Sequence, residues 1–254
     1  MEFQMTPPLK KRIREAMEMD LEGAVPDVAY LNNIFSPLGP LERIHLLYAY
    51  FKEKEVLVTS SFGTKSVFLL YLIHQMRPTQ VIHFIDTTYH FPETIAYKQE
   101  LIDRFGLEVV DVTPNPGENN VSREGAWWKA HPRLCCAINK IVPLEPIKAL
   151  HKVWVSGLMA YQTEFRSRLQ VFEQQGDILK FHPLIDVTEE TFETEMTMYG
   201  LPRHPLEDMG YGSIGCTHCT ERGEGRSGRW KATGQTECGL HPGYFDKEKK
   251  NDLF

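Results

Sequence analysis

Five cysteines give this sequence its clearest chemical signal. They form an adjacent pair, Cys135-Cys136, a second pair, Cys216 and Cys219, and a separate Cys238. Four thiolates in two pairs are a suitable ligand set for zinc or for an iron–sulfur cluster, and the spacing alone does not choose between them. The fifth thiol stands apart and is a candidate nucleophile. We therefore expect four cysteines to hold a metal centre and one to react.

Other interpretations of the cysteines explain less. An odd number of cysteines, without a secretion signal, argues against a disulfide framework, and adjacent cysteines form only a strained disulfide. A Cys-x-x-Cys motif can be a redox pair near the start of a βαβ unit, but Cys216 and Cys219 lie in a glycine-rich region. Adjacent residues of a helix point about 100° apart, so we expect the backbone to turn between Cys135 and Cys136 if both are ligands. Four inert buried cysteines would leave the pairing unexplained.

Apolar patterns predict strands that alternate with helices. The expected strands are short runs rich in β-branched and aromatic residues, at residues 56–59, 81–86, 107–112, 153–157 and 178–184. The expected helices cover residues 67–76 and 91–105, and Gly106 is the C-terminal stop of the second helix. This alternation predicts an α/β fold with a mainly parallel, twisted sheet and helices on both faces.

Three turns are expected at one edge of this sheet because each follows the end of a strand. They are residues 60–66, 86–90 and 156–167, and ligands of such sheets bind at that edge. Ser60, Ser61 and Gly63 place hydroxyl and backbone N–H groups at a helix N-terminus, which favours an anion. A simple helix cap would use the same residues. The run is not a Walker A loop, which disfavours ATP hydrolysis.

Residue composition and apolar patterning divide the chain into three regions. Residues 1–52 read as a helical packing layer, and residues 53–205 contain the α/β alternation. Residues 206–254 are rich in Gly, Cys, Arg and His and poor in periodic apolar residues, so we expect an active-site tail there.

Charge and hydropathy narrow the classes of function. A net charge of −6 argues against a general nucleic-acid binder. No apolar run approaches the ~20 residues of a membrane helix. The N-terminus lacks the cationic and apolar regions of a signal peptide. We expect a soluble cytoplasmic protein that binds neither nucleic acid nor a membrane.

Several motifs together resemble one family. They are Ser60-Ser61-Phe62-Gly63, Ile85-Asp86-Thr87, Phe91-Pro92-Glu93-Thr94, Cys135-Cys136, Ser156-Gly157-Leu158, Tyr211 to Cys219, and Glu237-Cys238-Gly239-Leu240-His241. In this order they resemble the assimilatory adenylyl-sulfate and phosphoadenylyl-sulfate reductases. The paired cysteines resemble the branch that carries a [4Fe–4S] cluster. The resemblance implies an adenine-nucleotide α-hydrolase-like sheet with nucleotide bound by residues 53–205, in agreement with the alternation above.

The resemblance implies reduction of a sulfonucleotide in sulfate assimilation and cysteine biosynthesis. Cys238, with His241 as a second catalytic residue, would form an S-sulfocysteine and release AMP. Thioredoxin or glutaredoxin would then release sulfite, and a homo-oligomer is possible. A thiolate and an anionic substrate both need positive charge nearby. The implied substrate-binding residues are Ser60, Ser61, Gly63, Asp86, Lys140, Gly157, Arg166, Arg226 and Arg229, and the implied cluster ligands are Cys135, Cys136, Cys216 and Cys219.

Departures from the family pattern bear on the substrate. Met159-Ala160 stands where the family often has two arginines, and Asn139 stands where an arginine is common. The smaller positive charge favours adenosine 5′-phosphosulfate, and its 3′-phosphorylated form is the alternative. A tRNA sulfurtransferase would need a Ser-Gly-Gly-x-Asp-Ser loop and a basic surface, which this chain lacks. A non-catalytic zinc module would leave Cys238 and the strand-end motifs unused.

Overall fold

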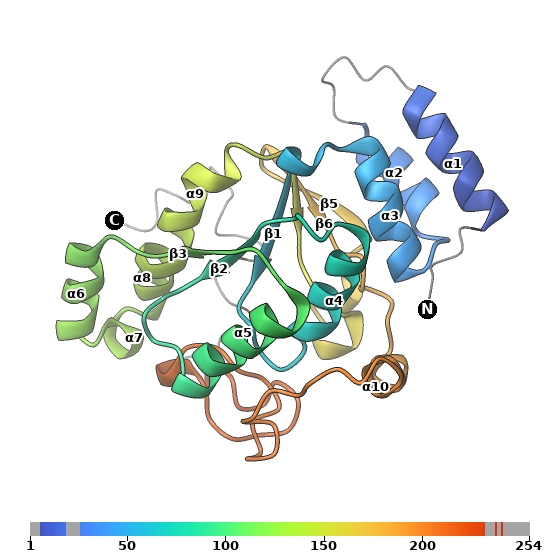
Figure 1. The fold of residues 1–254 in the computed structure, drawn as a ribbon. Helices are drawn as coiled ribbons and strands as arrows, with labels where there is room; N and C mark the ends of the chain where they lie inside the picture. The colour runs from blue at the N-terminus through green and yellow to red at the C-terminus, as the bar shows by residue number, and fades with distance from the viewer. Residues whose placement is uncertain (1–5, 19–25, 232–236, 238–239, 241–254) are drawn as a thin grey trace.

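The computed structural model describes residues 6–18, 26–231, 237 and 240 (Figure 1). Six strands form one sheet in the order β3-β2-β1-β4-β6-β5. The strands are β1 (Val56–Ser60), β2 (Ile82–Ile85), β3 (Val109–Val112), β4 (Val153–Val155), β5 (Phe172–Gln175) and β6 (Ile178–Phe181). All neighbours are parallel except β5 and β6, which form an antiparallel pair. The predicted, mainly parallel α/β fold is confirmed.

The parallel order brings the carboxyl ends of five strands to one edge of the sheet. In Figure 1 this edge lies at the bottom, where the orange and red segment that follows α10 crosses the strand ends. β1 is flanked by β2 and β4, so the turns that follow these three strands are neighbours. Ligand sites of such sheets form at this edge.

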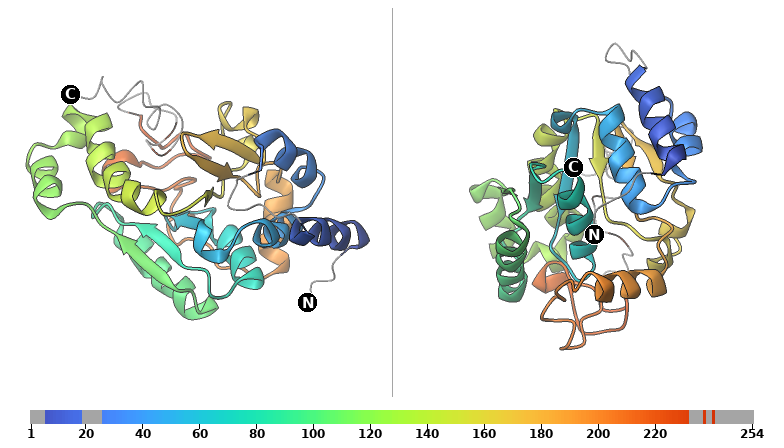
Figure 2. Two further views of the ribbon diagram at one scale, coloured as in Figure 1. Left: turned by 90° about the horizontal axis from the view of Figure 1, so that it is seen from above. Right: turned by 45° about the vertical axis from the view of Figure 1, so that its right-hand side comes forward.

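Helices cover both faces of the sheet, as Figure 2 shows from two further sides. On one face α4 (Ser66–Met76), α5 (Pro92–Phe105) and α10 (Glu189–Met198) enclose the larger apolar core. Gly106 ends α5 with a left-handed φ of 65°, as predicted. On the opposite face a smaller cluster joins Leu57, Trp154 and their neighbours to the helices that follow β3.

A run of short helices fills residues 116–148, for which the sequence patterns predict no elements. They are α6 (Pro116–Glu124), α7 (Trp127–Ala130), α8 (Pro132–Cys136), the π-helix η2 (Ala137–Ile141) and α9 (Val142–Lys148). Most are shorter than the two turns over which helical periodicity becomes visible. A proline begins α6 and α8, where its missing N–H is not needed.

The N-terminal layer is helical and packs on the same core as the sheet. It consists of α1 (Pro7–Glu18), α2 (Val28–Phe35) and α3 (Pro40–Tyr50). Outside this layer, short 3-10 helices occur at η1 (Glu53–Glu55), η3 (Ala160–Gln162), η4 (Arg166–Arg168) and η5 (Thr217–Cys219). Buried Arg43 of α3 binds Asp186 through both terminal nitrogens, at 2.5 and 2.6 Å. The domain boundaries at residues 52 and 205 stay a prediction.

The edge strand β5 is an element that the sequence does not reveal. Its residues, Phe-Glu-Gln-Gln, lack the β-branched side chains that mark the other strands. The Asn32 side chain of α2 compensates at the open edge: its Nδ2 donates to Phe172 O at 2.9 Å, and its Oδ1 accepts from Phe172 N at 2.8 Å. Capping of this kind shields an edge strand from unwanted pairing.

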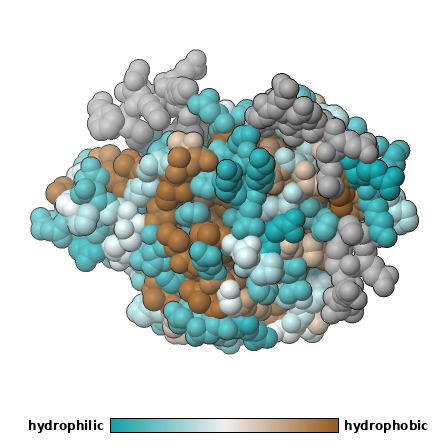
Figure 3. All heavy atoms as spheres, turned by 45° about the horizontal axis from the view of Figure 1, so that its top comes forward, coloured by the Kyte–Doolittle hydropathy of each residue, from teal (hydrophilic) through white to brown (hydrophobic). Residues whose placement is uncertain are grey.

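The surface mixes hydrophobic and hydrophilic side chains. On the face shown in Figure 3, hydrophobic residues form a band between hydrophilic zones. Leu150 is the most exposed large apolar side chain of the described part, at 78%. Within the same part, no helix combines the length and the apolar character that crossing a membrane requires.

Candidate active site

A pocket of about 360 Å³ lies at the carboxyl edge of the sheet. Residues from the turns after β1, β2 and β4 line it, together with residues of the segment 212–230. The predicted substrate-binding residues that border it are Ser60, Ser61, Gly63, Lys140, Gly157, Arg166, Arg226 and Arg229. The strand order explains why residues so distant in sequence meet here.

Asp86 is the predicted substrate-binding residue that does not border this pocket. Its Oδ1 accepts a hydrogen bond from Thr88 N at 2.8 Å, in a turn where Thr88 has a left-handed φ of 64°. The structure therefore places Asp86 as the cap of a turn. Thr87 borders the pocket instead, with its Oγ1 3.3 Å from Cys216 Sγ. An aspartate after a strand is common in both roles, so the sequence could not separate them.

The turn after β1 presents a helix start to the pocket. Ser60 Oγ accepts from Phe62 N at 3.0 Å, and Phe62 has a left-handed φ of 48°. Such a φ costs a non-glycine residue about 1–2 kcal/mol. Full burial of the Phe62 ring against Phe84, with ring centres 5.5 Å apart, offsets this cost. Because α4 begins at Ser66, its positive dipole end faces the pocket.

The turn after β4 is packed too closely for larger residues. A Cβ at Gly157 would lie 3.3 Å from Leu69 Cδ2, so this position permits contact between the turn and α4. Met159 is fully buried in the core, and Ala160 N donates to Ile185 O at 2.8 Å. The departure at Met159-Ala160 therefore replaces charge by a core residue.

His182, the residue directly after β6, supports the same turn. Its Nδ1 lies 2.8 Å from Ser156 Oγ, and the ring is 2% exposed. Burial, together with the positive charges of Lys180 and Arg166, lowers the pKa of His182 to about 3. The imidazole is therefore neutral at pH 7.

Lys180 is a pocket residue that the sequence motifs do not single out. It lies on β6 opposite Trp154 of β4 and is 3% exposed. Its Nζ lies 3.2 Å from the centre of the Trp154 ring, and Trp154 Nε1 donates to Thr59 Oγ1 at 2.8 Å. Buried lysines are rare, so a lysine within an otherwise apolar strand is a signal that could have identified it.

Arg229 is held at the pocket by backbone and aromatic contacts. It donates to Ile214 O at 2.9 Å and to Cys219 O at 3.3 Å, and its guanidinium carbon lies 4.1 Å from the centre of the Trp230 ring. A Cβ at position 215 would collide with the guanidinium. Gly215 is therefore needed for the close approach of Arg229.

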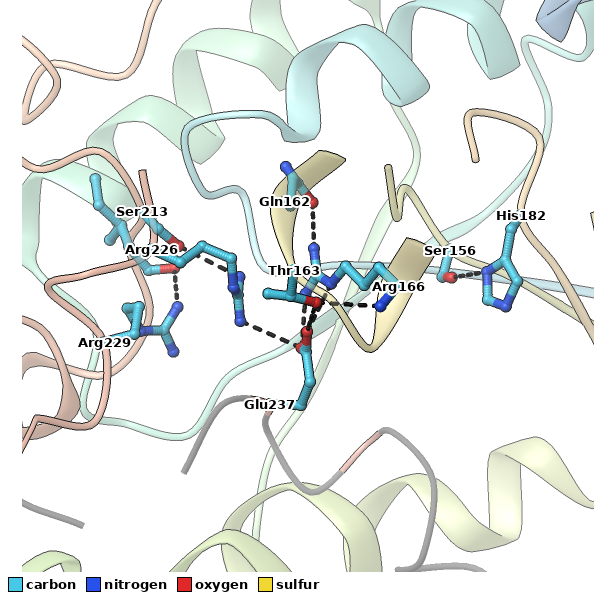
Figure 4. A network of polar contacts seen from close by, with 10 residues as sticks. Ser156, Gln162, Thr163, Arg166, His182, Ser213, Arg226, Arg229 and Glu237 are labelled. Carbon is cyan, nitrogen blue, oxygen red and sulfur yellow. Dashed lines mark hydrogen bonds and ion pairs between the residues drawn. The ribbon is translucent and has the colours of Figure 1, made fainter. Parts of the chain in front are cut away.

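Two other pocket arginines share one carboxylate, as Figure 4 shows. Arg166 donates to Glu237 through Nε at 2.8 Å and through Nη2 at 2.7 Å. Arg226 Nη2 lies 3.2 Å from the same carboxylate, and Thr163 Oγ1 donates to it at 3.0 Å. The exposed fractions of the Arg166, Arg226 and Glu237 side chains are 6%, 17% and 11%. The network is therefore largely shielded from water.

The four paired cysteines meet at a second, smaller pocket. Cys135, Cys136, Cys216 and Cys219 all border it. Tyr89, Trp128 and His218 enclose it, and the Trp128 and His218 rings stack with their centres 3.7 Å apart. Segments separated by about 80 residues in sequence therefore bring their thiols together.

The backbone between Cys135 and Cys136 is helical and makes no separate turn. The turn is expected only if both cysteines are ligands, and their ligation stays a prediction. Both residues belong to α8, and the chain continues directly into the π-helix η2. Both side chains nevertheless border the thiol pocket. π-helical turns within helices are frequent at functional sites.

Asn139 borders the thiol pocket and is 1% exposed. Its Nδ2 donates to Cys135 O at 2.9 Å and to Ser122 Oγ at 3.1 Å, and lies 3.7 Å from Cys135 Sγ. Its Oδ1 accepts from Asn119 Nδ2 at 2.8 Å. These contacts tie the cysteine-bearing helix to α6, which explains the departure from arginine at this position.

The protonation of the thiols reflects their proximity. Burial, together with the neighbouring thiols, raises the pKa of Cys135 to about 12 and that of Cys219 to about 11. Burial also opposes ionisation of Cys216, but Lys140, Thr87 and Arg229 together lower its pKa. A bound cationic centre would favour all four thiolates.

The two pockets share a wall. Thr87, Lys140 and Cys216 border both of them. Lys140 belongs to the π-helix that follows Cys136 and is 9% exposed. An anion in the larger pocket would therefore lie next to whatever the four thiols hold.

Cys238 and His241 lie outside the described residues. The structure does describe Glu237 and Leu240, which flank Cys238 and Gly239 in sequence. Glu237 binds two pocket arginines, and Leu240 borders the pocket and packs on the smaller apolar cluster.

Comparison with known proteins assigns the family. Residues 55–222 match the phosphoadenosine phosphosulfate reductase domain. An adenosine 5′-phosphosulfate reductase of Bacillus cereus (strain 03BB102) is 38% identical over 198 residues, which covers 74% of this chain and 85% of the relative. A protein of the same name from Bacillus thuringiensis (strain Al Hakam) is 37% identical over 212 residues, covering 80% and 90%. The chain belongs to the phosphoadenosine phosphosulfate reductase domain family.

Solved structures agree with this family in fold. A phosphoadenylyl-sulfate reductase from Candida auris, in complex with phosphate, superposes with a TM-score of 0.65 at 24% identity and covers 78% of this chain and 100% of its own. A yeast FAD synthetase in complex with FAD reaches 0.51 at 13% identity, covering 85% and 74%. Both structures share the fold of this chain.

The [4Fe–4S] cluster implied by the family resemblance can be compared with the residues present. Four cysteines around one enclosed pocket match its donor type and number. In the part of the chain that the structure describes, no three His, Cys, Asp or Glu side chains are already gathered around a single metal position. The donor set fits the cluster, and its occupancy stays a prediction.

Proposed function

We propose that this chain reduces adenosine 5′-phosphosulfate to sulfite and AMP in sulfate assimilation. Relatives that carry the name of this activity match it over 85% and 90% of their own lengths. The observation that carries the proposal is the shared wall of the two pockets, formed by Thr87, Lys140 and Cys216. It joins an anion-binding cleft to a four-thiol site within one fold.

The charge of the larger pocket suits an adenylyl sulfate. Its described lining includes six lysines or arginines and one glutamate, Glu189. Low exposure strengthens their attraction for anionic oxygens, since water screens them little. The start of α4 adds its positive dipole end at Ser66. These groups would neutralise the phosphate and sulfate of the substrate.

We propose Cys238 as the nucleophile. Its thiolate would attack the sulfur of the sulfate group, forming an S–S bond while the S–O bond to the phosphate breaks and AMP leaves. A dithiol donor, thioredoxin or glutaredoxin, would then attack the S-sulfocysteine. Sulfite leaves with the electron pair of the S–S bond, Cys238 is restored as a thiol, and the donor becomes a disulfide. Positive charge from the pocket arginines would favour the thiolate.

We assign Cys135, Cys136, Cys216 and Cys219 to the [4Fe–4S] cluster. The cluster would supply an electrostatic field beside the substrate, with no electron transfer required. Lys140 lies on the wall that faces it and would bind substrate oxygens. We also assign His241 to the active site and the reaction to the reducing cytoplasm, where the thiols persist.

The test is kinetic, with the anaerobically purified protein. Sulfite release is measured with thioredoxin and with either adenosine 5′-phosphosulfate or its 3′-phosphorylated form, and kcat/KM is compared. The proposal predicts activity with the first substrate at the higher kcat/KM. Preference for the 3′-phosphorylated substrate would reverse the substrate assignment, and sulfite release from neither would overturn the proposed function.

A further inference from the structure

Glu237 occupies the position where an external anion is expected. Its carboxylate accepts two hydrogen bonds from Arg166 and one from Thr163, and it forms an ion pair with Arg226 (Figure 4). Arg166 and Arg226 both border the strand-end pocket. Two guanidiniums around two carboxylate oxygens have the geometry that proteins use for phosphate and sulfate groups.

The charges show why this position cannot hold two anions at once. Arg166 and Arg226 bring two positive charges, and Glu237 already neutralises one. All three side chains are at most 17% exposed, so an added anion beside Glu237 would meet repulsion that water screens poorly. A ligand anion that uses both arginines must therefore displace the carboxylate.

We propose that Glu237 is an internal anion that competes with ligands for the Arg166–Arg226 pair. The inference rests on the proposed function, since it assigns this pair to the sulfate or phosphate of the sulfonucleotide. Displacement raises the apparent dissociation constant of every ligand that needs the pair by the same factor. Small inorganic anions bind weakly, so this increase in their dissociation constant leaves them unbound at ordinary concentrations. A sulfonucleotide has further contacts in the pocket and still binds.

The size of the effect follows from the contacts. A hydrogen bond to a charged group contributes about 1.5–3 kcal/mol, so loss of this network corresponds to roughly a tenfold change in affinity or more. Glu237→Gln removes the charge and keeps the shape. AMP and inorganic sulfate should both bind this variant at least about tenfold more tightly than the wild type, by a similar factor. Adenosine carries no anion, so its affinity should stay within about twofold.

The experiment is isothermal titration calorimetry of wild-type, Glu237→Gln and Glu189→Gln proteins with AMP, inorganic sulfate and adenosine. Glu189 borders the same pocket, so its variant controls for a general loss of negative charge. Glu189→Gln should change AMP affinity less than about threefold, because the ion pairs described for Arg166 and Arg226 involve Glu237 and not Glu189. Glu237→Asp keeps the charge on a shorter side chain and should give an intermediate affinity.

Several outcomes would overturn the proposal. They are unchanged AMP and sulfate affinities in Glu237→Gln, an equal gain for adenosine, or an equal gain in Glu189→Gln. Iron content and thermal stability verify that each variant is folded. These binding measurements do not depend on turnover. If the wild type releases no sulfite, the proposed function is wrong. Calorimetry still tests the role of Glu237 in that case.

Discussion

Replacing Arg43 by methionine should destabilise the protein without touching the active site. Arg43 is fully buried in the N-terminal layer and makes five hydrogen bonds. Three go to the carbonyl groups of Phe35, Ser36 and Pro183, and two go to the Asp186 carboxylate. The side chain thereby ties α2 and α3 to the segment that links β6 to α10.

The magnitude follows from what the substitution leaves behind. Asp186 is 58% exposed, so water would largely replace its lost partner. Each buried carbonyl group left without a hydrogen-bond donor costs about 1–3 kcal/mol of stability. Removal of the buried guanidinium charge offsets part of this total cost. We expect a loss of about 3 kcal/mol, which lowers the Tm by roughly 6–12 °C in a chain of this size.

The assay is thermal unfolding followed by circular dichroism, under anaerobic conditions and at one scan rate for all proteins. Arg168→Met is the control, since Arg168 is 73% exposed and pairs with the exposed Glu164. Its Tm should shift by less than about 2 °C. A Tm shift of Arg43→Met as small as that of the control would refute the view that Arg43 anchors this layer.

Three further variants test the supports of the site. His182→Asn should weaken the pH dependence of stability. The folded pKa of His182, about 3, lies below the unfolded value, so the wild type loses stability as pH falls below about 6.5, by about 1.4 kcal/mol at pH 5.5. Measurement of Tm against pH for both proteins would show the difference. Asn139→Ala, which frees Cys135, should lower metal affinity about 10–100-fold, and unchanged iron retention under chelator challenge would contradict this. Gly215→Ala should push Arg229 away and lower kcat/KM about tenfold at an unaltered Tm, and full activity would exclude the packing explanation.

The fold followed from the sequence wherever one strong pattern determined an element. The runs predicted at residues 56–59 and 153–157 contain the parallel strands β1 and β4, and buried parallel strands have near-continuous apolar sequences. Gly106 ends α5 because only glycine takes a left-handed φ at no cost. β5 could not be predicted because its polar residues form a strand only through pairing with β6 and hydrogen bonds to Asn32. The helices of residues 116–148 are too short for periodicity to appear.

The site was predictable where the residue type restricts the chemistry. Cysteine pairs and clustered arginines indicate ligands and anions, and these residues do converge at two adjoining pockets. Lys180 and Asn139 follow from no motif, because their importance comes from burial and from partners distant in sequence. Glu237 belongs to the motif around Cys238, but its role could not be predicted, since only the folded chain brings Arg166 to its carboxylate.

Intact-protein mass spectrometry tests the transfer of the sulfonate to Cys238 most directly. The anaerobic protein is incubated with adenosine 5′-phosphosulfate and no thiol donor, then weighed and mapped by peptide analysis. We predict a gain of one SO₃ group on Cys238, its absence in Cys238→Ser with iron content intact, and its loss on adding thioredoxin. An unmodified wild-type mass, or a sulfonate on another cysteine, would contradict the proposed reaction.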